Sequence, residues 1–202
     1  MWLPDLLTTY GPTVDCDKLQ PEHRKDNVVL GKLRPDSETD DGQALIVSGV
    51  GIYNVPGMVA VSAGAEIYPH KHAPERRWGW RSMLFEGIEV AGIRWPGGDH
   101  IDTFWASGTA KAKDAIDLTL VDCAFLAGGK GVQTIFLCGH WREVSIIGTR
   151  AAGMKHSCTL DMRGGATIRK LYTRRSPLVI TCKAGTPSKI DNDGQTVVKF
   201  EN

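Results

Sequence analysis

Two histidines and a glutamate stand close together in the segment Gly64–Trp80, which reads "GAEIYPHKHAPERRWGW". His70 and His72 are two positions apart, so in an extended strand both imidazoles lie on the same side and can reach one divalent metal ion. Glu75 would add a carboxylate oxygen to such a site. The alternative is that the two histidines are solvated residues of a proline-flanked loop.

The order Gly64, His70, His72 and Glu75 is similar to the first metal-binding motif of cupins, and this resemblance implies a cupin-like, metal-binding protein. The chain departs from the cupin pattern in its shorter gap between histidine and glutamate. A second motif with a Pro-x-Gly turn should follow, and the nearest candidate, His140 in "LCGHW", has no such proline. We therefore expect no stoichiometric metal ion at His70 and His72, and no metal site or cofactor in the chain.

Acidic side chains are the next group that could do chemistry. Polysaccharide-cleaving enzymes need an acid with a base, or acids that hold calcium near an arginine. No catalytic carboxylate pair is visible, and GxSxG and P-loop motifs are absent, so we predict no catalytic residues and a protein that is not an enzyme. The carboxylates considered are Asp99, Asp102, Asp114, Asp117, Asp122 and Asp161.

Basic and aromatic residues indicate possible contacts with partners. A basic group at the start and end of one predicted strand is either a solvated edge that discourages sheet growth or a contact for an acidic partner. Aromatic residues bind sugars by stacking or fill subunit interfaces, and we favour an interface. The basic residues are Arg169, Lys170, Arg174 and Arg175, and the tryptophans are Trp2, Trp78, Trp80, Trp95, Trp105 and Trp141.

Composition narrows the class of protein. A chain of 202 residues forms one or at most two domains. A net charge of +1 gives no global attraction to nucleic acid or acidic lipid. The sequence has no apolar run long enough for a transmembrane helix and no secretory signal. The five cysteines form no CxxC motif, which indicates free buried thiols in a protein folded in a reducing cytoplasm.

One strand pattern recurs along the chain. "LIVSGVGI", "IEVAGIRW" and "VSIIGTRA" share a frame in which Gly49, Gly92 and Gly148 occupy the same place. "LTLVDCAF" and "TIRKLYTR" fit the frame with Asp122 and Tyr172 at that place. The markers are 43, 30, 26 and 24 residues apart, and recurrence at such intervals predicts a solenoid or propeller.

Strand patterns follow one another from Gln43 onward with almost no helical periodicity, so the chain is predicted to be all-β. A second set of strands, "TIFLC", "CTLDM" and "LVITC", also alternates. Its apolar positions from Ile135 to Cys182 should stack on one side, with Thr159, Asp161 and Thr181 on a solvated side. The residues predicted to be buried in the interior of the solenoid are Val144, Ile146, Leu160 and Ile180.

Residues 1–43 differ from the rest because they are charged and punctuated by proline. We interpret them as an irregular N-terminal arm or docking segment, followed by a β-helical body with a C-terminal cap at 44–202. The apolar tip of the arm would pack either on its own domain or on a partner. The tip consists of Trp2, Leu3, Leu6 and Leu7.

Over Gln43–Lys183, two alternating strand types with short glycine turns resemble the right-handed parallel β-helix of pectin-lyase-like proteins and, more closely, of bacteriophage tail-spike and fibre proteins. The competing fold is a β-sandwich or jelly roll. The resemblance implies a non-enzymatic virion structural protein, a decoration, fibre or tail-spike component that folds in the host cytoplasm, forms a homotrimer and docks on a capsid or tail through its arm. A surface glycan is a possible further partner. A polysaccharide lyase or hydrolase on the same fold is the alternative function, beside the cupin-like one.

Overall fold

The computed structural model of the chain describes residues 3–20, 30–33, 44–55, 59–64, 68–69, 77–78, 80–93, 102–126, 133–152 and 156–201. Within these residues the protein is all-β, as predicted, with a single α-helix, α1 (Leu3–Tyr10). Short 3-10 turns are η1 (Cys16–Lys18), η4 (Ala112–Asp114) and η5 (Arg163–Gly165).

Nearly all strands belong to three sheets. Sheet A contains, in spatial order, β1 (Thr13–Asp15), β4 (Gly51–Tyr53), β9 (Glu89–Ala91), β12 (Ala124–Leu126) and β15 (Arg150–Ala152). Sheet B contains β2 (Leu30–Leu33), β5 (Val59–Gly64), β10 (Asp102–Ser107), β13 (Gln133–Cys138), β16 (His156–Asp161), β18 (Val179–Lys183) and β20 (Val197–Glu201). Sheet C contains β19 (Lys189–Asn192), β17 (Ile168–Arg174), β14 (Trp141–Ile147), β11 (Ile116–Val121), β8 (Ser82–Glu86) and β3 (Ala44–Ser48). The short strands β6 (Tyr68–Pro69) and β7 (Arg77–Trp78) form a separate antiparallel pair.

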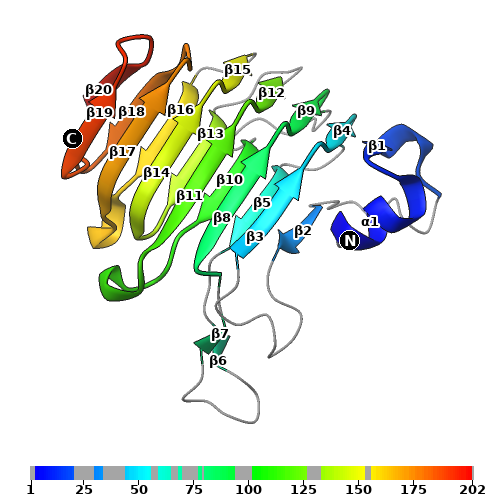
Figure 1. Ribbon diagram of the computed structural model, residues 1–202, viewed down its shortest axis with the longest axis horizontal. Helices are drawn as coiled ribbons and strands as arrows, with labels where there is room; N and C mark the ends of the chain where they lie inside the picture. The colour runs from blue at the N-terminus through cyan, green and yellow to red at the C-terminus, as the bar shows by residue number, and fades with distance from the viewer. Residues whose placement is uncertain are drawn as a thin grey trace.

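Successive strands visit the three sheets in a fixed order. From β3 to β16 the order is C, A, B, repeated, and from β17 to β20 it alternates between C and B. Every pair within the three sheets is parallel. The chain thus advances from α1 at one end of the stack to β20 at the other (Figure 1). A sandwich or jelly roll is built from antiparallel strands, so that alternative prediction is wrong.

A column of left-handed residues makes the corner at the end of the strands of sheet C, which leads to sheet A on the first four levels and to sheet B after β17. The residue that follows the strand of sheet C has a positive φ on five successive levels: Gly49, Gly87, Asp122, Gly148 and Arg175. The first four donate their backbone N–H to the carbonyl of the level that follows, at 2.8–2.9 Å. Glycine accepts this conformation without steric cost and aspartate tolerates it better than most residues. The corner therefore recurs at intervals of 38, 35, 26 and 27 residues.

The predicted frame identified three of these five corner positions. Gly92 and Tyr172 were assigned to the frame wrongly. Gly92 follows sheet A instead of sheet C, and it stacks on Asn54, which also has a positive φ. Tyr172 lies inside β17, opposite Ser145. Three segments of the predicted frame are therefore pairs of shorter strands with a sharp bend between them: "LIVSGVGI" spans β3 and β4, "LTLVDCAF" spans β11 and β12, and "VSIIGTRA" spans β14 and β15.

The core fills the space between the sheets. Val144, Ile146, Leu160 and Ile180 are fully buried in it, which confirms their predicted burial. The apolar positions of the second strand set also stack as predicted, with Ile135, Cys158 and Ile180 in one column. The other side of these strands is not solvated, because Thr159, Asp161 and Thr181 are all buried. Short side chains between close-spaced strands are shielded by their neighbours, and Thr159 lies directly next to Phe136.

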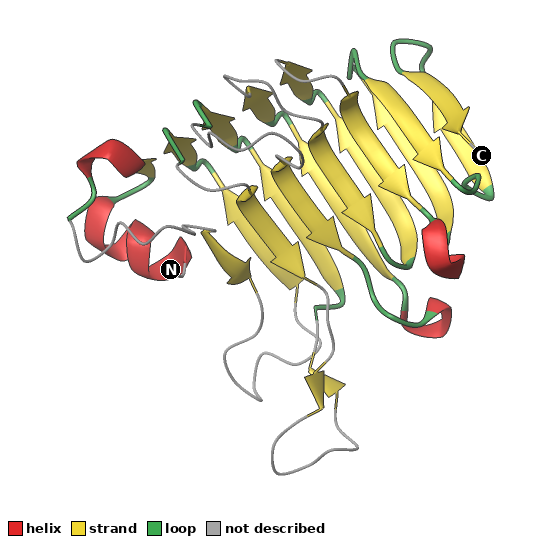
Figure 2. Ribbon diagram, turned by 180° about the vertical axis from the view of Figure 1, so that it is seen from behind, coloured by secondary structure: helices red, strands yellow, loops and turns green. Residues whose placement is uncertain are grey.

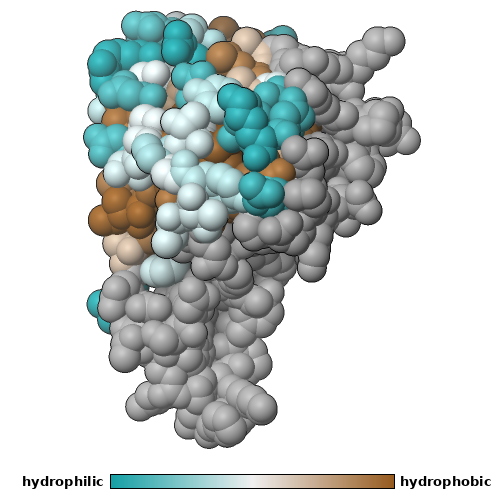
Figure 3. All heavy atoms as spheres, turned by 90° about the vertical axis from the view of Figure 1, so that its right-hand side faces the viewer, coloured by the Kyte–Doolittle hydropathy of each residue, from teal (hydrophilic) through white to brown (hydrophobic). Residues whose placement is uncertain are grey.

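The N-terminal segment covers one end of the core. Leu6 of α1 is buried, and Leu7 and Tyr10 pack against the core cluster. Val14 and Leu19 are buried as well, and β1 pairs with β4. The predicted apolar tip thus packs on its own domain where its side chains are described. Figure 3 views this end, where most of the coloured surface is hydrophilic or nearly neutral, with smaller apolar patches.

All five cysteines are free thiols, as predicted. Four are buried and Cys138 is half-buried. Burial raises the pKa of the Cys16 thiol to about 11, so it stays protonated at neutral pH. In the part of the chain that the structure describes, no helix has both the length and the apolar character to cross a bilayer.

Candidate functional site: the outer face of sheet C

The outer face of sheet C carries two carboxylates on neighbouring strands. Side chains alternate along each strand, and the inward positions of this sheet are filled by residues such as Leu118 and Val144. Asp117 and Glu143 therefore face outward, and they lie directly opposite one another in the register of β11 and β14. An outward pair of acids on adjacent strands is the type of arrangement from which carbohydrate-cleaving sites are built.

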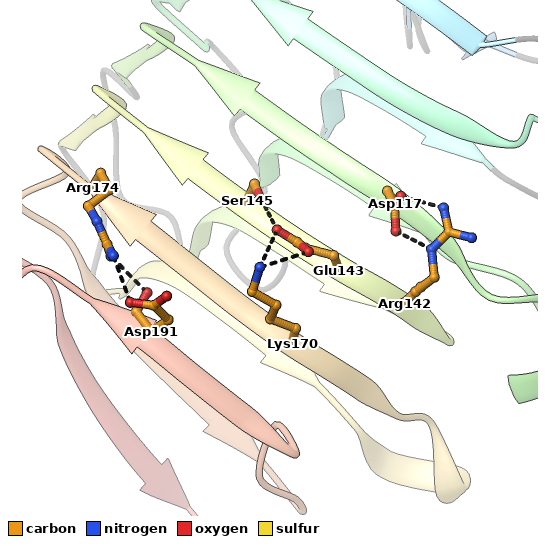
Figure 4. A network of polar contacts seen from close by, with 7 residues as sticks. All are labelled: Asp117, Arg142, Glu143, Ser145, Lys170, Arg174 and Asp191. Carbon is orange, nitrogen blue, oxygen red and sulfur yellow. Dashed lines mark hydrogen bonds and ion pairs between the residues drawn. The ribbon is translucent and has the colours of Figure 1, made fainter.

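A β-bulge positions the first of these carboxylates. The register of β11 and β14 shifts between Ile116 and Asp117, so Arg142 is the extra residue on β14. Its guanidinium binds both oxygens of Asp117, with Nε donating to Oδ1 at 2.7 Å and Nη2 donating to Oδ2. This contact raises the pKa of Arg142. Arg142 and Asp117 thus form a bidentate ion pair on the protein surface (Figure 4).

The second carboxylate is held by a lysine and a hydroxyl. Lys170 Nζ lies 3.0 and 3.1 Å from the two oxygens of Glu143. The hydroxyl of Ser145 donates to Glu143 Oε1 at 2.8 Å. Figure 4 shows these side chains pointing toward one another from β14 and β17. Each oxygen of Glu143 therefore has a donor from the same chain.

The charged network continues to the last strand of the sheet. Arg174 donates to Asp191 Oδ1 at 2.6 Å and lowers the pKa of that carboxyl. The ring of Tyr172 lies between two cations, 4.3 Å from the guanidinium of Arg174 and 5.3 Å from Lys170 Nζ. Opposite charges on adjacent strands stabilise a sheet by about 0.2–1 kcal/mol per pair. The three carboxylates of this half, Asp117, Glu143 and Asp191, thus each have a cationic partner in the chain.

Chemically, the pair Asp117 and Glu143 has the residue types of a glycosidase but not its usual environment. A general acid must be kept protonated, which requires burial or an unpaired neighbouring carboxylate. Here both carboxylates are paired with a cationic side chain, Asp117 with Arg142 and Glu143 with Lys170.

A cavity of about 370 Å³ lies beside η5, and its lining includes Arg163, Thr186 and Ser188 but neither acid of sheet C.

Outward apolar side chains also lie on this face, beside the exposed Glu86, which is in register with Val121. Ile46 on β3 is the most exposed large apolar residue that the structure describes, with 62% of its surface accessible. It lies opposite Leu84, which is half-buried. Val121 and Ile147 face the same side and are also opposite one another. These four residues, Ile46, Leu84, Val121 and Ile147, are called the apolar half of sheet C below.

A column of polar residues lies at the start of three strands of sheet B. Asp102, Gln133 and His156 are in register on three neighbouring strands. Asp102 and Gln133 are buried, and Oδ1 of Asp102 and Oε1 of Gln133 have no hydrogen-bond partner. Burial raises the pKa of the Asp102 carboxyl to about 7. No pattern in the sequence could have indicated this column, because it depends on the register between distant strands.

The structure distributes the residues proposed from the sequence over several places. His70, His72, Glu75 and Asp99 lie outside the described residues, and the expected absence of a metal ion there stays a prediction that elemental analysis can check. Among the described residues, no group of three or more His, Cys, Asp and Glu side chains is placed to hold a metal ion. Nδ1 of His140 instead lies 2.9 Å from Thr167 Oγ1.

The remaining acids are separated from one another. Asp114 lies in η4, and Asp161 forms an ion pair with Arg163, which lowers the pKa of the carboxyl. Asp122 sits at the corner, with Arg175 Nη2 3.8 Å from its Oδ1. Sequence reasoning missed Glu143, Arg142 and Ile46.

The structure decides part of the basic and aromatic predictions, while an interface role for tryptophans other than Trp141 stays a prediction. β17 lies between β14 and β19, so the prediction that the basic group guards a sheet edge is wrong. Lys170 and Arg174 are instead bound to acids of the same sheet, as described above. Trp141 is fully buried, with Nε1 donating to the carbonyl of Cys138 at 2.9 Å, so it serves the core and cannot serve an interface.

Comparison with protein-family models, with curated proteins and with solved structures finds no match to this chain. The arguments on function below therefore rest on the geometry of the described residues and on the sequence pattern.

Proposed function

We propose that the chain is a non-enzymatic structural protein of a phage-like particle, and that its body is a short right-handed parallel β-helix that associates as a homotrimer. The repeated visits to sheets C, A and B support one helical turn per three strands. The strand pattern resembles that of tail-spike and fibre proteins. In this proposal residues 3–20 cap the β-helix, and docking on a capsid or tail falls to the outer surface of that cap.

The apolar half of sheet C is the observation that carries the proposal. Exposed apolar surface on one face marks a protein-protein contact, and here Ile46 is exposed while Leu84, Val121 and Ile147 are half-buried. Three ion pairs of the neighbouring half are made within the chain, so burial beside a second copy leaves none of these six charges without a partner. Three copies that meet through sheet C would cover this face while both ends of each β-helix stay accessible.

The oligomeric state tests the proposal. Light scattering should give the mass of three chains of 22.0 kDa, or a multiple of it, for the unmodified protein. Ile46→Lys should abolish this association in threes, because three lysines would be buried near one axis. Ala152→Lys places the same charge on the exposed end of β15 in sheet A and should leave the trimer intact. A trimer that tolerates Ile46→Lys, or a protein that is monomeric throughout, would contradict this contact.

Location in the particle is tested separately. When the chain is produced together with the genome that encodes it, mass spectrometry of purified particles should find it in a fixed ratio to the main shell protein. A chain found only in the fraction without particles would count against a structural role in the virion.

The opposed acids of sheet C support one alternative, a polysaccharide lyase or hydrolase that uses Asp117 and Glu143. A substrate hydroxyl or carboxylate would have to displace Arg142 or Lys170 to free an acid. Incubation with acidic and neutral polysaccharides, followed by detection of new reducing ends or unsaturated products, tests it. Cleavage that is lost in Glu143→Gln and kept in Glu86→Gln, an exposed glutamate of the same sheet, would favour this function over the structural one.

A further inference from the structure

The last strand of sheet B presents an open edge with exposed apolar side chains. β20 pairs with β18 on one side only and ends the sheet. Val197 and Phe200 on this strand are 51% and 52% exposed. A strand edge offers unpaired N–H and C=O groups to any other extended segment. Figure 2 shows the edge strands of sheets B and C side by side at the C-terminal end.

Phe200 is an exposed residue on the inward side of this edge, whereas Val197 lies on the outer side, opposite Val179. Phe200 is in register with Cys182, and Val198 is in register with Ile180, both of which are fully buried inward positions. Ile190 on β19 continues the inward column of Leu171 in the same way. Among the described residues, the inward columns are therefore uncovered at this end, whereas α1 covers them at the other end. Terminal turns of a solenoid need such a cover.

We propose that a second copy of this chain covers this end, through antiparallel pairing of β20 with β20 of the second copy. The charges of the strand are complementary to themselves when the pairing is centred on Phe200. Lys199 then lies opposite Glu201 of the second copy, and Glu201 opposite Lys199 of the second copy. Both pairs are on the outer side of the sheet, because these positions alternate with the inward Phe200.

This register is better than its two neighbours. Centring on Lys199 would place the two lysines opposite one another, which is destabilising. Centring on Val198 would place Lys199 opposite an apolar residue and leave Glu201 without a counter-charge. In the chosen register the two Phe200 rings meet on the inner side, where they join the two cores. Main-chain hydrogen bonds then supply affinity, while the charges select the register.

The two-copy contact is separate from the proposed trimer contact, since it uses sheet B at one end and not the face of sheet C. Sedimentation analysis is therefore carried out on full-length Ile46→Lys, in which the trimer contact is removed. The expected species contains two chains. A species of one chain would overturn the end-to-end contact. Three chains would overturn it too and would show that the association in threes does not depend on Ile46, whereas six chains would contradict only the assigned trimer contact.

Charge exchange tests the register. Lys199→Glu and Glu201→Lys should each raise the dissociation constant of the pair by about tenfold, because each creates two like-charge contacts. The double variant should return it to within about twofold of the starting value, since both attractive pairs are restored. Lys189→Glu, an exposed lysine on β19, is the control and should have little effect. Failure of the double variant to restore pairing, with all variants folded by circular dichroism, would overturn the proposal.

Discussion

At the scale of the residue, the side of the strand that a side chain occupies decides what a substitution does. Ile146 is fully buried between Val144 of its own strand and its neighbours Leu120 and Thr173. Ile146→Asp should cost several kcal/mol, about the largest loss that a point substitution produces, because the charge has no partner in the core. Thermal unfolding measures the loss. Ala152→Asp, at an exposed position of β15 outside both proposed contacts, should melt nearly normally, and an equal loss in both variants would contradict the assigned burial of Ile146.

Gly148 tests the left-handed corner. Its φ is +60°, and a Cβ at this position would collide with Oδ1 of Asp122. That carboxylate is exposed and can move, so the backbone conformation sets the cost. Gly148→Ala should destabilise the protein by about 1–2 kcal/mol. Gly148→Asn adds the same Cβ but tolerates the left-handed region, so it should cost less in denaturant unfolding. Equal losses would mean that the contact with Asp122, and not φ, requires glycine.

Asp102 predicts an unusual dependence of stability on pH. Its pKa is about 7 in the folded protein and 3.8 in the absence of burial, because burial disfavours the charged form. The folded state therefore binds more protons than the unfolded state between these values. Stability contributed by the neutral carboxyl is complete below about pH 4 and is lost as the pH rises to about 7. Asp102→Asn should remove this loss, so the melting temperature of the variant should exceed that of the unmodified protein increasingly as the pH rises.

A falling or constant difference between these two melting curves over the same pH range would contradict the burial of the Asp102 carboxyl. Asp114→Asn is a suitable control, because this half-exposed carboxyl lies in η4, away from the column of sheet B.

Alternation along single strands was enough to predict which residues are inward. Val144, Leu160 and Ile180 follow from period two alone, because a strand in a solenoid has one face against the core. The same reasoning failed for Thr159, whose burial depends on neighbours that are distant in sequence. The pair of Asp117 and Glu143 could not be predicted, since it requires a bulge and a register between two strands.

At the scale of the element, the corners explain what the repeated frame could and could not show. Gly49, Asp122 and Gly148 were aligned correctly because each follows a strand of sheet C. Gly92 misled the alignment because the residue after a strand of sheet A also has a positive φ on two levels. Arg175 gave no signal, as arginine seldom adopts this conformation. Glycine therefore marks corners in the sequence without showing which corner each one makes.

The N-terminal cap gives a prediction for an element. Leu6 is buried against the end of the core, so Leu6→Ala should reduce the free energy of unfolding by about 2–5 kcal/mol. Lys18→Ala removes only an exposed ion pair with Asp15 and should change it by less than about 1 kcal/mol. Denaturant titration of both variants makes the comparison. If Leu6→Ala unfolds like the unmodified protein, α1 is not a cap and a docking role for its apolar face becomes the better interpretation.

At the scale of the whole molecule, the three sheets share one core but present different surfaces. Stacked parallel strands bury one continuous core, and each level contacts only the levels on either side. The outer face of sheet C offers an apolar half for lateral contacts, and the edge of sheet B offers an apolar end. The proposed lateral and end contacts use different residues, so substitutions at one should leave the other unchanged.

Hydrogen exchange should reveal this organisation as a gradient of protection. Opening of a stacked structure begins at its ends, because a terminal level has a neighbour on one side only. Amides of β11 and β14 in the middle of sheet C should exchange slowest, and those of β20 and β19 fastest, while β1 is shielded by the N-terminal cap. Mass spectrometry after exchange at low protein concentration measures the gradient.

Raising the protein concentration should slow exchange in β20 through pairing with a second copy, and should leave exchange in β19 nearly unchanged. Uniform protection across all strands would contradict the stacked opening, and equal slowing of β19 and β20 would place the contact over the whole end instead of on the edge of sheet B.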